Sequence, residues 1–158
     1  AGAVGSAAVQ IARARGARVL GTASPANHDY LRSLGAEPTT YGDGLAQRLC
    51  ELAPDGADAA LDAAGGGALP ALVELTGSPD RVLTIADYAG VQQTGVKFSG
   101  GVGTARAVHA LTDIGPLIEA GKFSLPVAQT FPLAEAAEAH KRSESGHVRG
   151  KLVLLVDP

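Results

Sequence analysis

Two glycines at the start of the chain have a spacing that suits phosphate binding. Gly2 and Gly5 lie in the segment AGAVGSAAVQ and match the last two glycines of the dinucleotide motif G-x-G-x-x-G. In that motif one glycine lets the backbone approach a pyrophosphate, and the next lets a helix pack closely on a strand. The helix then presents its free amide groups to the phosphates. Gly2, Ala3, Val4 and Gly5 are therefore candidate cofactor-binding residues, with an ordinary glycine-rich turn as the alternative interpretation.

The residues after the second apolar segment would choose between NAD and NADP. NAD-specific sites carry an acidic residue there, which accepts hydrogen bonds from the ribose hydroxyls. No acidic residue occurs from Ala17 to His28, so the 2′-phosphate of NADP would meet no repulsion. Ser24 can donate to that phosphate, although Ser24 followed by Pro25 is also an ordinary helix start. Asn27 lies in the same turn, which contains no Arg or Lys. The sequence therefore predicts NADP as the cofactor.

These candidates need a framework that brings strand ends together, and the hydrophobic pattern predicts one. Helices are expected over residues 5–15, 25–34, 45–53, 69–76 and about 104–120. Strands are expected over residues 17–23, 38–41, 57–62, 81–86 and 95–98. Uniformly apolar strands that alternate with helices are typical of a parallel sheet covered on both faces. The predicted fold class is α/β, with a doubly wound parallel Rossmann sheet.

The doubly wound order places its first strand at the centre of the sheet. The glycine segment would follow that strand, so we expect a Val/Ile/Leu-rich strand ahead of Ala1 in a longer protein. After Gly121 the pattern changes to FSLPVAQTFPL and GKLVLLVDP, two strand-like segments around a helix over 133–141. The sequence therefore predicts an N-terminally truncated Rossmann domain over residues 1–121 and a second structural unit over 122–158.

Composition limits the classes of function. The chain has 158 residues, of which 46% are hydrophobic and 18% charged, enough for a folded core. A net charge of −3 gives no broad basic surface for nucleic acid, and no apolar run is long enough for a membrane span. Cys50 is the single cysteine, which excludes an internal disulfide, and we expect it in the core beside Leu45 and Leu49. A cytoplasmic protein without nucleic-acid or membrane partners is expected.

Five segments together carry a family resemblance: AGAVGSAAVQIARARGARVLGTAS, LRSLGAEPTTYGD, ADAALDAAGG, RVLTIAD and GHVRGKLVLLV. Over residues 1–156 the chain resembles the medium-chain dehydrogenase/reductase superfamily, and within it the zinc-free quinone oxidoreductase-like branch. The resemblance implies NADPH-dependent hydride transfer to a quinone or an α,β-unsaturated carbonyl compound. It also implies that the C-terminal segment completes a GroES-like catalytic domain. The alternatives are a non-catalytic nucleotide-binding or sensing domain and a zinc-dependent alcohol dehydrogenase of the same superfamily.

The resemblance also implies roles for individual residues. Gly2 to Gly5 would hold the pyrophosphate, and Ser24, Asn27 and Tyr41 would surround the 2′-phosphate. The other implied cofactor-binding residues follow later strands, near the ribose and nicotinamide: Asp62, Ala64, Gly65, Ile85, Ala86, Asp87, Phe98 and Ser99. Asp62 and Tyr41 have structural alternatives. Asp62 could simply accept from loop amides, and Tyr41 could pack on the sheet. No metal ligand is implied, and the catalytic residues stay unassigned.

The last expectation concerns association. The strand over residues 95–98 would lie at the edge of the sheet, where its outer amides and carbonyls need a partner. Members of the superfamily commonly pair this strand across a twofold axis. We therefore expect a homodimer joined through Gly95 to Phe98, acting on a small-molecule substrate.

Overall fold

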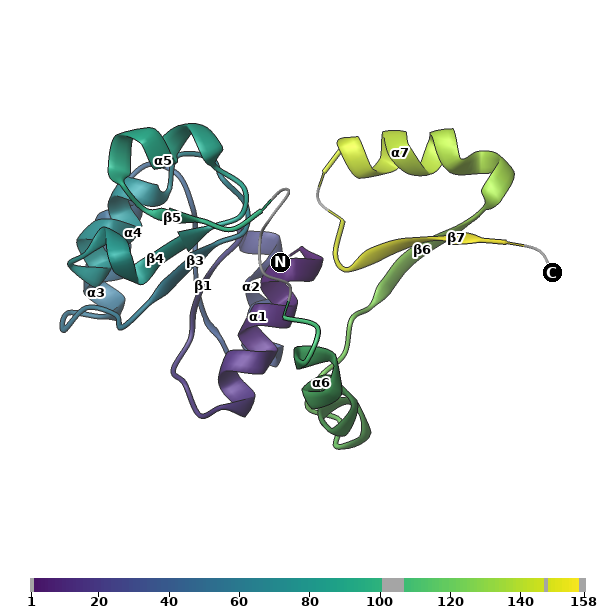
Figure 1. The fold of residues 1–158 in the computed structure, drawn as a ribbon, viewed down its shortest axis with the longest axis horizontal. Coiled ribbons are helices and arrows are strands. Elements are labelled where there is room, and N and C mark those ends of the chain that lie inside the picture. The colour runs from purple at the N-terminus through teal and green to yellow at the C-terminus, as the bar shows by residue number, and fades with distance from the viewer. Residues whose placement is uncertain (1, 101–106, 147, 157–158) are drawn as a thin grey trace.

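The computed structural model describes residues 2–100, 107–146 and 148–156, in which helices alternate with strands (Figure 1). The helices are α1 (Ala3–Ala14), α2 (His28–Ser33), α3 (Leu45–Leu52), α4 (Leu69–Thr76), α5 (Tyr88–Thr94), α6 (Ala110–Glu119) and α7 (Ala136–Glu144). The strands are β1 (Leu20–Thr22), β2 (Glu37–Thr39), β3 (Ala60–Asp62), β4 (Val82–Thr84), β5 (Lys97–Phe98), β6 (Val127–Pro132) and β7 (Lys151–Leu155). Short 3₁₀ turns are η1 (Pro25–Asn27), η2 (Pro79–Arg81) and η3 (Leu133–Glu135).

Every strand pair of the described residues is parallel, which confirms the predicted α/β class. The pairs form separate sheets, β1–β2, β3–β4–β5 and β6–β7, rather than one continuous sheet. The expected single doubly wound sheet is therefore divided between β1 and β3 within the described part of the chain. The doubly wound order places a further strand at that position. The expectation of such a strand ahead of Ala1 stays a prediction.

Several predicted elements differ from the structure at their ends. Helix α4 has the predicted bounds. The strands are shorter than predicted because segments such as residues 57–59 lie in loops, and β2 also begins one residue earlier than predicted, at Glu37. Helix α1 begins two residues earlier than predicted, which places Gly5 in its first turn. Helix α5 was not predicted, because a glycine and two glutamines obscure its pattern. Its start is fixed by Asp87, whose side chain accepts from Gly90 N at 2.8 Å. The predicted helix start near Thr104 lies outside the described residues.

Small and branched apolar side chains form the core in three clusters. One joins α1, β1 and α2 through Val9, Ala23, Leu31 and Ala36. A second joins α3 and α4 through Leu45, Leu49, Ala53 and Leu75, and a third joins α4, β4 and the start of β5 through Leu69, Val82 and Val96. The expectation that Cys50 lies in the core is wrong, because Cys50 is exposed. Five positions beyond Leu45 on a helix of 3.6 residues per turn, Cys50 faces away from the core.

An exposed ion pair joins the segment just before β1 to the first residue of β2. Arg18 Nε and Nη2 each donate to a carboxylate oxygen of Glu37 at 2.7 Å. The hydrogen bond from Arg18 holds the pKa of Glu37 below its ordinary value, and the same contact raises the pKa of Arg18. Because this pair lies in solvent, it contributes little to the stability of the fold.

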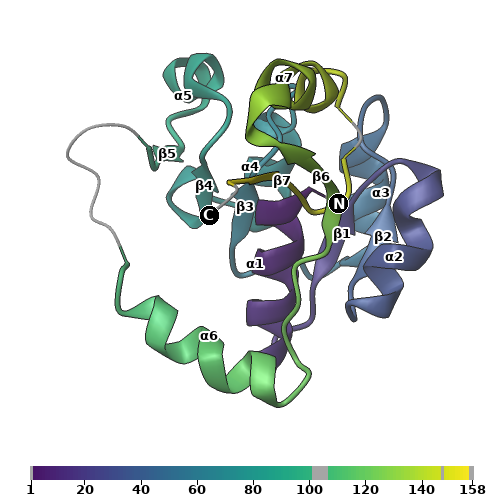
Figure 2. The same cartoon turned by 90° about the vertical axis from the view of Figure 1, so that its right-hand side faces the viewer.

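The C-terminal segment forms its own β–α–β unit, in which α7 covers β6 and β7 (Figure 1). Its connection to α1 runs through Gln10, a buried glutamine in the middle of the helix. Gln10 Nε2 donates to Ser124 O at 2.9 Å, and Gln10 Oε1 accepts from Ser124 N at 2.8 Å. Figure 2 shows α6 beside the C-terminal end of α1. There, Arg15 Nη2 and Asp113 Oδ2 lie 3.8 Å apart. The C-terminal unit is thus tied to the rest of the chain through the Gln10 side chain of α1.

Candidate cofactor-binding site

Apart from the glycine segment at the start of α1, the predicted site residues gather at the carboxyl ends of the parallel strands, where α/β sheets place their ligands. They form two groups. Ser24, Asn27 and Tyr41 follow the adjacent strands β1 and β2, whose ends are joined by Ala23 N donating to Thr39 O at 3.0 Å. The other group follows β3, β4 and β5 and contains the residues from Asp62 to Gly65, from Ile85 to Asp87, and Phe98 and Ser99.

In the first group, a distant arginine joins the predicted residues. Asn27 Nδ2 donates to Ser24 Oγ at 3.0 Å. The guanidinium of Arg149, which lies 122 residues further along the chain, donates to Asn27 Oδ1 from Nη2 at 2.8 Å and from Nε at 3.2 Å. It also lies over the ring of Tyr30, 4.6 Å from the ring centroid. No cation was predicted for this turn, because the cation comes from the distant segment just before β7.

This group has hydrogen-bonding capacity that the described protein atoms leave unused. The Tyr30 hydroxyl is buried and has no hydrogen-bond partner within the described residues. A guanidinium has five N–H donors, and the bonds to Asn27 use two of them. Ser24 begins η1, but its side chain makes no capping bond to the backbone and instead accepts from Asn27. A cation and a serine in a turn without acidic residues fit a phosphate.

Tyr41 is held beside this group by its backbone. Arg48 Nη2 donates to Thr40 O at 2.8 Å and to Tyr41 O at 3.4 Å, while Nη1 donates to Asp43 O at 2.8 Å. The Tyr41 side chain is 53% exposed, so the alternative that it packs on the sheet is wrong. In the described part of the chain, no hydrogen bond joins Tyr41 to Ser24 or Asn27. Its contact with a 2′-phosphate stays a prediction.

In the second group, Asp62 is turned inward. Its Oδ1 accepts from Ala64 N at 3.1 Å and from Gly65 N at 2.8 Å, and its Oδ2 accepts from the Thr84 hydroxyl at 2.7 Å. Asp62 therefore accepts from loop amides, as the structural alternative in the sequence analysis predicts. Thr84 is fully buried and was missed, because a threonine at a strand end carries no distinctive sequence signal.

The loops of this group are close to one another. Gly65, Gly66 and Gly67 have φ values of +73°, +76° and +77°, so this loop consists of consecutive left-handed residues. A Cβ built on Gly65 would lie 3.6 Å from Ala86 O. Ser99 N donates to Thr84 O at 3.0 Å, and the Phe98 ring meets Tyr88 edge-on with centroids 5.4 Å apart. The structure thus brings the predicted residues of β3, β4 and β5 to one edge.

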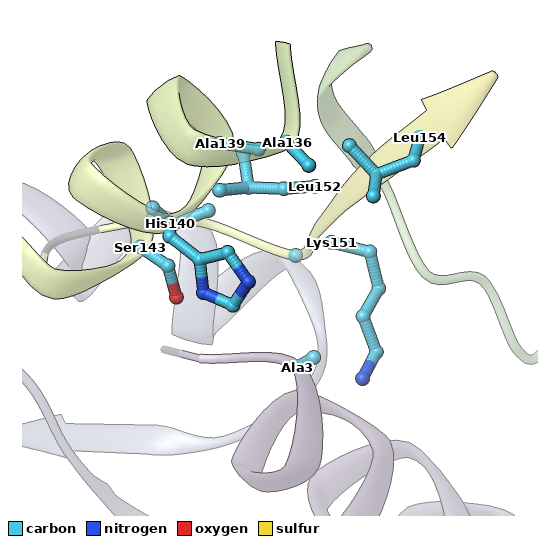
Figure 3. Close-up of a pocket in the computed structure, with 10 residues that line it drawn as sticks. Ala3, Ala136, Ala139, His140, Ser143, Lys151, Leu152 and Leu154 are labelled. Carbon is cyan, nitrogen blue, oxygen red and sulfur yellow. The ribbon is translucent and has the colours of Figure 1, made fainter. Parts of the chain in front are cut away.

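The glycine segment lies at the start of α1. Gly2 precedes the helix in an extended conformation, and no side chain caps the first turn. A Cβ built on Gly2 or Gly5 would meet no heavy atom within 4 Å, so the close packing predicted for Gly5 has no partner among the described residues. A cavity of about 360 Å³ opens between Ala3, α7 and β7. His140, Ser143 and Lys151 lie around it, on the side of the start of α1 (Figure 3).

Within the described ranges, no group of three or more His, Cys, Asp or Glu side chains is placed to hold a metal ion. None of the described helices is long and apolar enough to cross a membrane.

The parallel α/β fold, with its candidate residues at the strand ends, defines a nucleotide-binding domain of the dehydrogenase type. Residues 34–154 match the family described as zinc-binding dehydrogenase, and the chain belongs to this family. The predicted membership in the medium-chain dehydrogenase/reductase superfamily is thereby confirmed.

Relatives and solved structures agree with this assignment. The chain is 32% identical to the mitochondrial NAD(P)H oxidoreductase RTN4IP1 of Homo sapiens, over 98% of the chain and 46% of the relative. It is also 32% identical to the polyketide synthase GfsB of Streptomyces halstedii, over 100% of the chain and 3% of that protein. A crystal structure of an NAD-dependent alcohol dehydrogenase superposes with a TM-score of 0.81 at 29% identity, with 99% of this chain and 50% of that one covered. The quinone oxidoreductase of Coxiella burnetii gives 0.78 at 30% identity, with the same coverage. The chain thus spans about half the length of these dehydrogenase relatives or less.

Proposed function

We propose that this chain is the cofactor-binding part of an NADPH-dependent oxidoreductase that reduces a quinone or an α,β-unsaturated carbonyl compound. The observation that carries the choice of NADPH is the position of Arg149 on Asn27, beside Ser24, in a turn without acidic residues. The similarity to the NAD(P)H oxidoreductase RTN4IP1 and to the quinone oxidoreductase of Coxiella burnetii supports the reaction class.

Each part of the chain has a task in this proposal. The free amides at the start of α1 hold the pyrophosphate, and Arg149, Ser24 and Asn27 bind the 2′-phosphate. The loops after β3, β4 and β5 flank the ribose and the nicotinamide, fix the orientation of the ring and exclude water. When bound, NADPH supplies a hydride from C4 of the nicotinamide ring. No zinc is assigned, because no cluster of donor groups within residues 2–100, 107–146 and 148–156 fits the metal.

The C-terminal unit has a second task. Val127, Leu154 and Leu155 are 56%, 38% and 51% exposed on β6 and β7, which is unusual for apolar residues in a sheet. We propose that residues 122–158 complete a GroES-like catalytic domain, whose further strands cover these residues. Substrate-binding groups then come mainly from that domain.

The test of the cofactor proposal is a direct comparison of NADPH and NADH. The full-length protein is expected to bind NADPH at least about tenfold more tightly, since charge-assisted hydrogen bonds to one phosphate contribute about 1.5–3 kcal/mol. Fluorescence titration of each reduced cofactor measures both dissociation constants. Equal affinities would contradict the assignment of Arg149, Ser24 and Asn27 to a 2′-phosphate.

We also propose a homodimer through β5. This strand has no partner on its outer side among the described residues, and its residue Phe98 and the neighbouring Tyr88 are exposed. Ser99 N donates inward to Thr84 O. Alternate residues of a parallel strand face the same neighbour, so the Phe98 N–H points outward, where a second copy of β5 could accept from it.

Phe98→Pro is expected to shift the protein from dimer to monomer. Proline lacks the outward N–H but is tolerated on an edge strand whose amide faces solvent, so the fold should survive. Val96 is a poorer target, because it is 3% exposed and packs in the core. Phe98→Leu keeps the amide and serves as the control. Light scattering measures the mass in solution, and an unchanged dimer for Phe98→Pro would place the interface elsewhere.

A further inference from the structure

A buried carboxylate and a buried hydroxyl meet at the ends of β3 and β4. Asp62 and Thr84 are directly paired in the strand register, and both side chains are shielded from solvent, at 4% and 0% exposure. The hydroxyl of Thr84 donates to Oδ2 of Asp62 at 2.7 Å. Figure 1 shows the two strands as neighbours in the same sheet. The contact therefore joins two strand ends from inside the protein.

Each member of this pair also holds the loop that follows its own strand. Asp62 Oδ1 accepts from the amides of Ala64 and Gly65. Thr84 Oγ1 accepts from the amides of Ala86 at 3.1 Å and Asp87 at 3.0 Å. Each of the two loops is held by two hydrogen bonds from its backbone amides, and the single hydrogen bond between the side chains connects the two loops.

The chemistry requires these residue types. A threonine hydroxyl has one proton to donate and two lone pairs to accept with. Here the hydroxyl donates a hydrogen bond to Asp62, and its oxygen accepts hydrogen bonds from the two backbone amides. The carboxylate accepts three hydrogen bonds and donates none. Because the site is buried, water cannot easily replace a lost partner, and each unpaired amide or oxygen would be costly.

We infer that Asp62 and Thr84 are positioning residues, which set the spacing of the two loops that flank the nicotinamide half of the cofactor. The inference rests on the proposed function. Both oxygens of Asp62 are engaged by the protein, so this carboxylate acts through the loops and makes no contact with the ribose. The adenosine half is held by Arg149 and Ser24, beyond the separate β1–β2 sheet, and does not depend on the pair.

The experiment compares valine and serine at position 84 in the full-length protein. Thr84→Val keeps the shape but removes the hydroxyl, and it is expected to weaken NADPH binding about tenfold or more. Thr84→Ser keeps the hydroxyl and is expected to restore binding to within about twofold of the wild type. The ligand 2′,5′-ADP, which contains the adenosine half alone, is expected to bind all three proteins equally.

A second buried threonine provides a matched control. Thr76 is 4% exposed and its hydroxyl donates to Leu72 O at 2.9 Å, at the far end of α4 from the site loops. Thr76→Val is expected to lower the melting temperature as Thr84→Val does, without changing NADPH affinity. Asp62→Asn keeps one oxygen that can accept from the two loop amides. Its other terminal atom is an amide nitrogen, which cannot accept from the Thr84 hydroxyl. This variant is expected to weaken NADPH binding about threefold or more and to leave 2′,5′-ADP unchanged, even where Thr84→Val folds poorly.

The outcomes separate this inference from the proposed function. Tight NADPH binding by the wild type, with no effect of Thr84→Val or Asp62→Asn, overturns the positioning role alone. Equal losses of NADPH and 2′,5′-ADP affinity in these variants also overturn it, because they indicate a general loss of structure. Failure of the wild type to bind NADPH overturns the proposed function and this inference together.

Discussion

Replacing Arg149 by glutamate is expected to weaken NADPH binding by roughly 30-fold or more and to change NADH binding by less than about threefold. Arg149 has N–H donors beyond the two that bond to Asn27, and a 2′-phosphate at Ser24 would accept from them. Glutamate removes these donors and adds a charge that repels the phosphate. NADH has no 2′-phosphate and loses neither contact. Fluorescence titration of both reduced cofactors measures the ratio.

Arg142→Glu is the matched control for the change of charge. Arg142 lies on α7 and donates locally, to Ser145 Oγ at 2.8 Å and to Gly146 O at 3.2 Å. It is expected to leave both affinities within about twofold, since a charge in solvent outside the site is screened. If Arg149→Glu weakens NADPH and NADH equally, Arg149 serves only to attach the C-terminal unit to α2. If both variants weaken NADPH equally, the effect is one of net charge.

The local features of the fold could be predicted from the sequence. The helix over residues 69–76 was predicted with its correct bounds, and in the structure Pro70 lies at its start while Gly77 ends it in the left-handed conformation. The apolar strands between helices indicated parallel pairing. The predicted strands were too long, because apolar residues such as Ala57 continue into loops where tertiary contacts, and not the pattern, decide the structure.

The long-range contacts could not be predicted in the same way. Arg149 and Asn27 lie 122 residues apart, and Gln10 and Ser124 lie 114 apart. No local pattern marks such a pair, because the side chains meet only after the C-terminal unit has packed on α1 and α2. Asp62 was recognised as a candidate, but its orientation depends on Thr84 across the strand pair, which a single strand does not reveal. Candidate residues after the strands could therefore be proposed from the sequence, while the partners Arg149 and Thr84 could not.

Ser24→Asp is expected to reverse the cofactor preference, so that NADH binds more tightly than NADPH. Ser24 precedes η1 in an extended conformation, where aspartate is as well tolerated as serine. The new carboxylate would accept from the ribose hydroxyls of NADH, as the acidic residue of NAD-specific sites does. It would also attract Arg149 and Asn27, which withdraws the cation from the 2′-phosphate, and it would repel that phosphate directly.

The size of the reversal follows from these two effects. A lost charge-assisted bond and a new repulsion should together weaken NADPH binding by roughly 100-fold, while the new ribose contacts strengthen NADH binding about threefold or more. Ser24→Asn has nearly the same shape as Ser24→Asp and no charge, so it isolates the carboxylate and is expected to keep NADPH as the preferred cofactor. Titrations of both variants with both cofactors, at low and high salt, provide the measurement. Because the repulsion is electrostatic, the loss of NADPH affinity in Ser24→Asp should be smaller at high salt. A loss of the same size at both salt concentrations, or in Ser24→Asn, would mean that position 24 acts through the shape of the turn and not through its charge.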